Sequence, residues 1–298
     1  AMSRALGRDI GPGDEVVVTR LDHDANVAPW LAMAEDRGAT VRWLELADDG
    51  ATLDLGRLGD VLTDRTRIVA VGLASNALGT VTDVRRVTDA AHAVGAIAYV
   101  DAVHAAPHLP IDVAALGADL LACSPYKFFA PHLGALYGRR ELLERLTAYR
   151  VRPAGAALPG KWETGTQNHE ALAGLLGTFG YLELVGAAYD RATTADDRRT
   201  KLRAAMTAIR AHERGLSSGT LDRLATVPGL RVHGISDPAR LDERVPKQRQ
   251  TLFFSATMPN GVHALAMRIM DDPEWIEATP PATVADRVDQ TVYSVRGE

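Results

Sequence analysis

The stretch 98–138 constrains the fold of this chain more than any other part of the sequence. An apolar run over 96–100 stops at Asp101, and a second apolar run over 119–123 leads, four residues on, to Lys127. Continuous apolar runs of this length are typical of strands that are buried on both faces of a parallel sheet. One sheet is therefore expected to present an acid and a lysine at its carboxyl edge, where open α/β sheets bind ligands.

Apolar strand patterns and amphipathic helix patterns alternate along most of the chain, which predicts an α/β fold with a largely parallel sheet and crossover helices. The further expected strands are 15–19, 40–44, 67–73, 134–138 and 230–235, with 134–138 pairing beside 119–123. The expected helices are 27–37, 54–64, 83–94, 170–188 and 196–214, after the end of a helix within 1–10.

Bulk properties fit an ordinary soluble protein of one or two domains. The chain has 298 residues, a net charge of −5 and a pI near 6.0, so no general attraction to nucleic acid or membranes is expected. One cysteine excludes an internal disulfide and fits a reducing compartment. With neither a signal peptide nor an apolar run of membrane-spanning length identified, a cytoplasmic location is expected.

The acid and the lysine suit pyridoxal phosphate (PLP) chemistry. A lysine holds the PLP aldehyde as a Schiff base, and an acid paired with the ring nitrogen keeps the ring protonated, so that it can accept electrons. The alternative for an isolated pair is that Asp101 caps a turn and Lys127 is a solvated amine. Five ordered motifs, two of which contain this pair, decide against this alternative.

These motifs resemble the PLP signature of class V aminotransferases, and more closely their cysteine desulfurase-like branch. They are Tyr99-Val100-Asp101-Ala102-Val103-His104, Ser124-Pro125-Tyr126-Lys127, 21–30, 75–80 and 162–166. The likeness extends from the N-terminus to the low 240s. It implies a PLP-dependent transferase fold of type I, with a large domain over 1–190 and a long helix and the start of a small domain over 191–245.

The resemblance also implies roles for individual residues. Lys127 would carry the Schiff base and act as general base, and His23 would stack on the ring and take part in proton transfer. The cofactor would be bound by His23, Asn26, Asn76, Asp101, His104, Ser124, Tyr126, Lys127 and, across a dimer interface, Thr166. No metal site is expected.

Several of these residues have a plain structural alternative. His23 fits a turn with Asn26 as the N-cap of the next helix. Asn76 followed by Gly79 fits a turn. Thr166 fits a helix cap, with Glu170 near the position of a capping box.

Departures from the family pattern bear on activity. The resemblance implies a segment before residue 1 that ends in a phosphate-binding turn, and we expect this segment to be missing here. Cys123 ends an apolar strand and is expected in the core, whereas a desulfurase needs a nucleophilic cysteine on a loop near its C-terminus. The arginine for the substrate carboxylate is expected in a missing C-terminal part, so transamination, lyase chemistry and racemisation all stay open.

The sequence changes character near residue 246. Lys247 to Pro259, with 278–283 and 288–293, resembles the DEAD-box RNA helicase segment around its Ser-Ala-Thr motif. We therefore expect 246–298 to be a short α/β graft, with a strand at 251–254 and a helix near 262–270. No P-loop lysine motif or Asp-Glu-Ala-Asp motif occurs, so ATPase activity is not expected.

The sequence thus predicts a truncated PLP enzyme acting on an amino acid, a homodimer if it folds. Two other classes stay open. One is a non-catalytic fusion or scaffold, and the other is an RNA-associated module that uses the tail. The tail carries five Lys or Arg against seven Asp or Glu, which argues against RNA binding.

Overall fold

The computed structural model describes residues 1–163, 165–189 and 197–243, which lie in one compact unit, Ala1–Lys247. The expected strand at 251–254, the expected helix near 262–270 and the whole helicase-like tail lie outside the described residues. The helicase-like resemblance of 246–298 and the elements expected there therefore stay predictions from the sequence.

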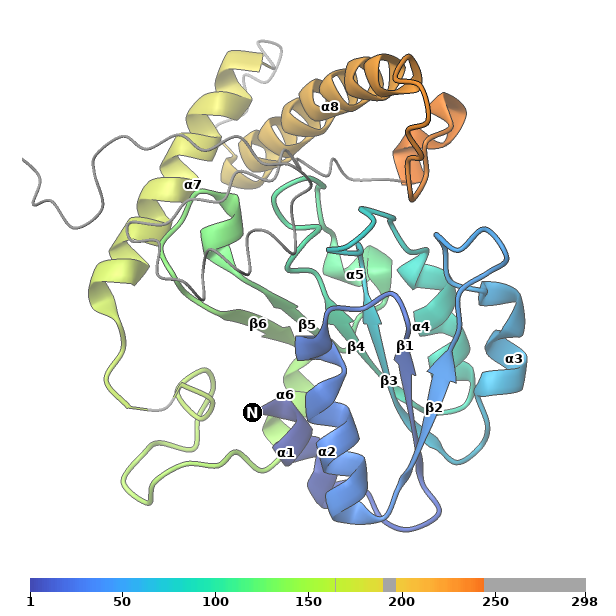
Figure 1. The fold of residues 1–298 in the computed structure, drawn as a ribbon. Coiled ribbons are helices and arrows are strands. Elements are labelled where there is room, and N and C mark those ends of the chain that lie inside the picture. Colours follow the sequence, from blue (N-terminus) through green and yellow to red (C-terminus); the bar gives the residue numbers. More distant parts are fainter. Residues whose placement is uncertain (164, 190–196, 244–298) are drawn as a thin grey trace, which may run out of the picture. The chain divides into compact units, whose positions relative to one another are not determined.

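A six-stranded sheet in the order β2-β1-β3-β4-β5-β6 forms the centre of the fold (Figure 1). The first five strands run parallel, and β6 pairs antiparallel with β5. The expected parallel α/β sheet is confirmed. The strands are β1 Glu15–Thr19, β2 Thr40–Leu44, β3 Thr66–Gly72, β4 Ile97–Asp101, β5 Leu120–Cys123 and β6 Ala135–Gly138.

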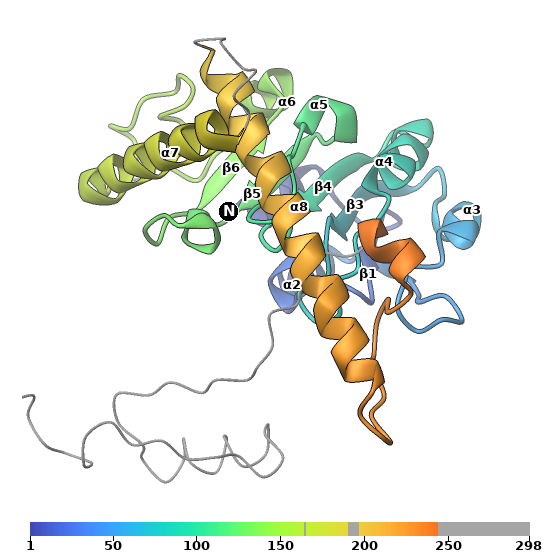
Figure 2. The same ribbon diagram turned by 90° about the horizontal axis from the view of Figure 1, so that it is seen from above.

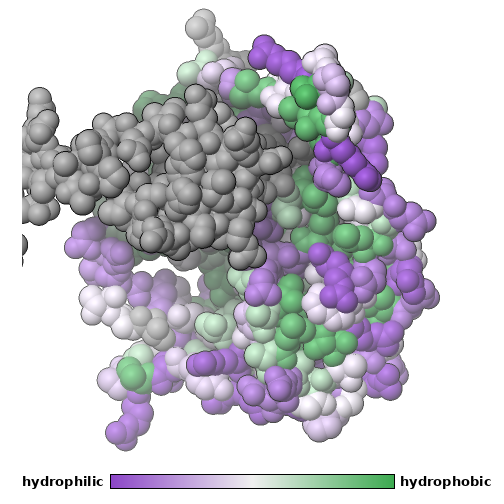
Figure 3. Space-filling model, viewed as in Figure 1, coloured by the Kyte–Doolittle hydropathy of each residue, from purple (hydrophilic) through white to green (hydrophobic). Residues whose placement is uncertain are grey.

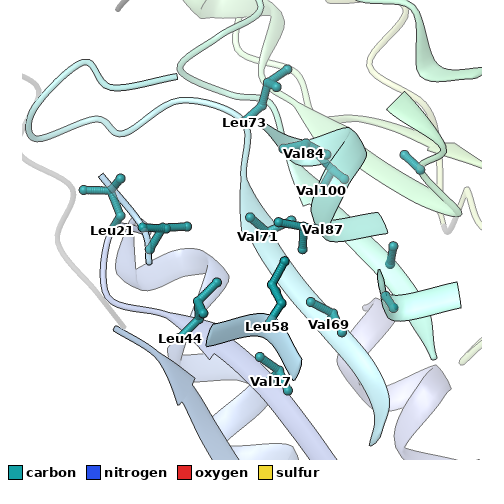
Figure 4. Packing of buried hydrophobic residues seen from close by; sticks show 14 of the residues in the cluster. Val17, Leu21, Leu44, Leu58, Val69, Val71, Leu73, Val84, Val87 and Val100 are labelled. Carbon is teal, nitrogen blue, oxygen red and sulfur yellow. The ribbon is translucent and has the colours of Figure 1, made fainter. Parts of the chain in front are cut away.

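Both faces of the sheet are covered, which explains the continuous apolar runs. On one face, α1 (Met2–Leu6), α2 (Ala28–Arg37) and α6 (Arg140–Arg145) pack on alternate residues of the central strands. On the other face, α3 (Leu58–Val61) and α4 (Val84–Ala93) lie against the remaining strand residues (Figure 4). Because a two-sided core removes both sets of side chains from water, all five residues of β1 are buried.

Side-chain caps fix the starts of two helices, α4 and α5 (Val113–Leu116), whereas α1, α2, α3 and α6 have no side-chain cap hydrogen bond. Asp83 accepts a hydrogen bond from Arg86 N at the start of α4, and Asp112 accepts from Ala114 N and Ala115 N at the start of α5. The connections also hold short 3-10 turns: η1 Gly7–Asp9, η2 Asp24–Asn26, η3 Leu55–Arg57, η4 Pro125–Phe128 and η5 Pro238–Glu243.

Two long helices follow the sheet, α7 (His169–Tyr189) and α8 (Arg198–Ala225), drawn in yellow and orange (Figures 1 and 2). They pack on each other closely at Gly186, where a Cβ atom would overlap the carbonyl of Lys201. α8 continues eleven residues beyond the predicted end at 214, and buried Leu221 belongs to that extension.

Two other predicted elements differ in the structure: one predicted strand is absent, and one predicted helix is shorter than expected. The segment 230–235 forms no strand: Gly234 has a φ of +97°, and it approaches the carbonyl of Leu78 while Ile235 is buried. This segment therefore packs as a loop on the turn after β3. The helix predicted over 54–64 is only η3 followed by the four-residue α3.

The expectation that no apolar run reaches membrane-spanning length is also wrong. By length and composition α7 is long and apolar enough to cross a membrane, and 22% of its apolar window is buried inside the structure. One helix of this kind among the described residues does not assign the chain to a membrane, because core helices of soluble proteins meet the same criterion. On the face seen in Figure 3, hydrophobic residues gather in small groups among hydrophilic ones.

Candidate functional site

Asp101 is the last residue of β4 and lies at the carboxyl edge of the sheet. It pairs in register with Gly72 on β3 and with Ala122 on β5. Its Oδ1 accepts a hydrogen bond of 2.8 Å from Val103 N. Burial raises the pKa of the Asp101 carboxyl, while the hydrogen bond and the nearby His23 act in the opposite direction. A cation beside this carboxylate would be held strongly, since little water screens it.

Lys127 lies in the connection that follows β5, the strand next to β4. β5 ends at Cys123, Ser124 is the N-cap of η4, and Lys127 is exposed within this turn. The Lys127 Nζ is 5.2 Å from the centroid of the Tyr126 ring, which stacks on His132 at 5.0 Å and 16°. His132 was not identified from the sequence, and only its place five residues after Lys127 could have suggested it.

Helix α7 holds the end of the lysine turn. Phe129, which ends η4, adopts a left-handed conformation with a φ of +67°. Its carbonyl accepts a hydrogen bond of 3.1 Å from Thr178 Oγ1, and its ring meets Tyr181 edge-on at 5.7 Å. An unusual backbone conformation of this kind persists only where surrounding contacts determine it. The long helix therefore contributes to the position of the Lys127 turn.

His23 and Asn26 lie in the loop after β1. His23 is exposed, and its Nδ1 accepts a hydrogen bond of 3.0 Å from Ala25 N, so it caps η2. Asn26 is 2% exposed and donates to Asp22 Oδ2 at 3.0 Å, while its Oδ1 accepts from Trp30 Nε1 at 3.2 Å. The alternative that Asn26 is the N-cap of α2 is wrong, because its side chain is engaged with Asp22 and Trp30.

Asp22 is a second partly buried acid at this edge, and sequence analysis gave it no role. Burial, together with the negative charge of Asp101, raises the pKa of Asp22 to about 7, although Gly72 N–H, Asn26 and Thr19 all donate to it. The sequence could have indicated Asp22 as a site residue, because it lies between the end of a buried strand and His23. The sequence does not reveal that Asp22 is close to Asp101.

The other predicted residues divide into two groups. His104 follows β4 and meets His108 edge-on at 5.5 Å. Asn76 follows β3 and is exposed in a turn that Ser75 Oγ supports through Ala77 N and Leu78 N, so the turn alternative describes its local structure. Because β1, β3, β4 and β5 are neighbouring parallel strands, the segments after them meet at one edge and bring eight of the nine predicted residues to it.

Thr166 is the ninth predicted residue and does not follow a strand of this edge. It is exposed, and it lies three residues before the first residue of α7. The cap of that helix is Asn168, whose Oδ1 accepts from Ala171 N at 3.0 Å, so the alternative that Thr166 caps the helix is wrong.

Cys123 is partly buried at the end of β5. Burial raises the pKa of its thiol, and the negative charge of Asp101 raises it further. A thiol held protonated is a poor nucleophile. The prediction that Cys123 belongs to the core is only partly met, because the residue is partly buried and lies outside both hydrophobic clusters.

The family model for class V aminotransferases matches residues 1–204. The chain belongs to the class V aminotransferase family. The family is PLP-dependent, and the comparison confirms the family and the type I fold predicted from the sequence. The match ends before the residues that resemble a helicase.

Relatives of this class V chain include a probable cysteine desulfurase of Streptomyces coelicolor, 36% identical over 242 residues, and a cysteine desulfurase of Dickeya dadantii, 36% identical over 236 residues. These alignments cover 77% and 75% of the chain and 52% of each relative. The chain thus spans about half the length of the curated relatives it matches.

Solved structures of cysteine desulfurases have a similar fold. The crystal structure of the cysteine desulfurase CsdA from Escherichia coli has a TM-score of 0.64 at 31% identity, covering 76% of this chain and 54% of that one. The apo structure of the cysteine desulfurase from Thermococcus onnurineus has a TM-score of 0.62 at 26% identity, covering 78% and 58%.

The class V site fits PLP in the chemistry of its groups. A carboxyl at a strand end, in surroundings poor in water, suits a protonated ring nitrogen, and an exposed amine one turn beyond the next strand suits an aldehyde. Ser124, at the start of the same turn, has a hydroxyl that makes no cap hydrogen bond.

Proposed function

We propose that this class V chain binds PLP at the carboxyl edge of its sheet and acts on an amino acid. The supporting observation is the placement of Asp101 and Lys127 after neighbouring parallel strands, with Asp101 in an environment that raises its pKa. We further propose a large domain over 1–190, a long helix and the start of a small domain over 191–245, and a separate segment over 246–298.

Each residue has a task within this proposal. Asp101 stays ionised when a ring cation lies against it, which fixes the orientation of the ring and keeps its nitrogen protonated. His23 offers a flat face above the ring and a site for a proton at its imidazole. Ser124 and Tyr126 would offer hydroxyls to the phosphate group, and Asn76 and His104 would hold the ring oxygen.

Lys127 has two tasks. Its Nζ would hold the cofactor through the aldehyde with loss of water, and once the substrate amine has displaced it, the free Lys127 amine would accept the proton from Cα of the substrate. PLP, when bound, supplies an electron sink that stabilises the negative charge left at that carbon. The exposure of Lys127 leaves its amine accessible to both the cofactor and the substrate.

The named activity of the relatives, cysteine desulfuration, is not assigned to Cys123. Its thiol is partly buried and held protonated, whereas a persulfide-forming cysteine must be an accessible thiolate. The proposal is therefore limited to amino-acid chemistry at Lys127, with transamination, lyase chemistry and racemisation as candidate outcomes.

The experiment is a visible absorption titration with PLP, followed by borohydride reduction and peptide mapping. The chain has four lysines, Lys127, Lys161, Lys201 and Lys247, so a reduced label is readily located. A new visible band and a label on Lys127 are expected. Lys127→Ala should lose both, and the matched variant Lys201→Ala, on α8, should keep both.

Other outcomes would reject the proposal. Equal labelling of the four lysines in both variants would mean that PLP reacts only with surface amines. Absence of any specific band would leave the chain as a non-catalytic member of its family.

A further inference from the structure

Asp22 and Asp101 lie on the same face of the sheet, side by side across one strand spacing. Asp101 pairs in register with Gly72, so the side-chain directions at these two positions are the same. A Cβ atom at Gly72 would overlap Asp22 Oδ1, which places the Asp22 carboxyl in the space that a side chain at position 72 would occupy. Adjacent strands are about 4.8 Å apart, so the two carboxyl groups are neighbours.

A fixed set of donors holds Asp22 in this place. Asn26 Nδ2 donates to Oδ2 at 3.0 Å, Gly72 N–H and Thr19 also donate, and Asn26 is itself held by Trp30 Nε1 at 3.2 Å. Trp30 packs edge-on against Tyr99, two residues before Asp101, at 5.1 Å. The carboxyl is thus positioned from both β1 and β4.

Two neighbouring carboxyls in a site poor in water cannot both ionise easily, because the second charge is repelled by the first. Among the described residues, His23, Tyr99 and Cys123 are the other ionisable groups that interact with Asp101. Burial raises the pKa of Tyr99 and Cys123, and the negative charge of Asp101 adds to it. Of these three groups, His23 is the one that acts to lower the pKa of Asp101.

We propose that Asp22 is a positioning residue of the cofactor site: it holds a proton while Asp101 alone is charged, and it releases that proton to solvent when a pyridinium ring binds beside Asp101. The O–H bond of Asp22 breaks, the proton passes to water, and the ring cation balances the new carboxylate. The ring then faces two negative charges instead of one. This inference rests on the proposed function, since it needs PLP at Asp101.

The experiment compares PLP affinity between pH 5.5 and pH 8 in the wild-type chain and in Asp22→Asn, by absorption titration. The reference ligand is 1-deaza-PLP, which has CH in place of the ring nitrogen. The preference for PLP is the ratio of the two affinities. Because both ligands carry the same phosphate group, the effect of its titration cancels in this ratio. Over this pH range the wild-type preference for PLP should rise about tenfold, which corresponds to ~1.4 kcal/mol of charge interaction. In Asp22→Asn the preference should stay at its low-pH value, because the amide mimics the protonated acid.

The matched control is Asp24→Asn, which removes an exposed carboxyl two residues away and should keep the wild-type pH dependence. His23 is present in all three chains, so any effect that it has on the affinity is common to them. Equal pH profiles in wild type and Asp22→Asn, with Lys127 still labelled, would overturn the role of Asp22 and leave the proposed function intact. If Lys127 is not labelled in any chain, the proposed function fails and this inference fails with it.

A second measurement needs no cofactor. In the infrared difference spectrum of wild type minus Asp22→Asn at pH 6 in D₂O, a protonated carboxyl band is expected above 1700 cm⁻¹, roughly where neutral acids absorb when shielded from water. A carboxylate band alone would overturn the proposal. Gly72→Ala, which displaces the carboxyl without removing it, should weaken or shift the protonated band.

Discussion

The imidazole Nδ1 of His108 lies 3.0 Å from both carboxylate oxygens of Glu213, joining the turn after β4 to the middle of α8. The two side chains are 18% and 22% exposed, so water screens the contact only in part. Since His108 also meets His104 edge-on, this pair links the long helix to a predicted cofactor residue. The partners are 105 positions apart in the sequence, which makes the contact a tertiary link.

We expect His108 and Glu213 to be energetically coupled by about 1 kcal/mol, the typical net value of a partly buried hydrogen bond. A double-mutant cycle with His108→Ala and Glu213→Ala, followed by urea unfolding, measures this coupling. The exposed pair Arg140 and Glu144, 73% and 56% exposed, is the control and should show coupling close to zero. Equal coupling in both cycles would show that α8 is not held through His108.

The pH dependence of stability should carry the signature of Asp22. Its pKa is about 7 in the folded chain against 3.8 without the fold, so the folded state binds the proton more tightly. The stability from this group is complete below about pH 4 and is lost as the pH rises through about 7. Urea unfolding of the cofactor-free protein should show wild type losing stability relative to Asp22→Asn between pH 5 and pH 8. Parallel curves for the two chains would contradict the raised pKa.

The sequence predicted the sheet well because each central strand is buried on both faces and so has a continuous apolar run. β3, β4 and β5 each lie within one residue of their predicted bounds at both ends. Asp101 and Lys127 were found for the same reason, since each follows a run whose end is clear. The segment 230–235 has apolar residues interrupted by Arg231 and His233, and the strand predicted there does not form. A local pattern cannot show whether a partner strand exists or that Gly234 has a positive φ.

The part of the site that the sequence could not predict depends on the order of the strands. Asp22 lies 79 positions before Asp101, and the two meet only because β3 separates β1 from β4 in the sheet and has glycine at position 72. Likewise, Asn26 was assigned to the cofactor or to a helix cap, whereas its amide is held between Asp22 and Trp30. Local motifs identify which residues are present, and the non-local sheet decides which of them touch.

Asp119 should be among the side chains most important for stability outside the site. Its carboxylate accepts from Ala98 N at 2.8 Å and from Arg139 Nη1 at 3.1 Å, and His92 Nε2 lies 2.8 Å away. The side chain is only 9% exposed, so its loss leaves several donors unsatisfied. We expect Asp119→Ala to lower the free energy of unfolding by about 2–4 kcal/mol.

Urea unfolding checks this prediction. Asp89→Ala, which removes an acid from the exposed pair with Arg85, is the matched control and should move the midpoint far less. Asp119→Asn should fall between wild type and Asp119→Ala, because the amide oxygen can still accept from Ala98 N. A loss for Asp119→Ala no larger than for Asp89→Ala would contradict the importance of this network.

The apolar surface of α7 predicts self-association. Leu176, Leu184 and Tyr189 are 61%, 72% and 74% exposed, which is unusual for so many large apolar side chains on one helix. Burying them against a second copy would stabilise a dimer at about 25 cal/mol for each Å² of apolar area removed from water. The family resemblance led us to expect a homodimer, and this helix is the surface that we propose for it.

Sedimentation velocity across a range of concentrations should show a dimer in the wild-type chain and a monomer in the double variant Leu176→Glu and Leu184→Glu. The control is Leu46→Glu, a leucine that is 36% exposed and lies outside α7, and that variant should remain a dimer. Flotation with phosphatidylcholine vesicles separates this explanation from membrane binding, for which the length and composition of α7 would also suffice. A wild-type monomer that floats with the vesicles would reject the dimer, because the apolar face would then be covered by lipid.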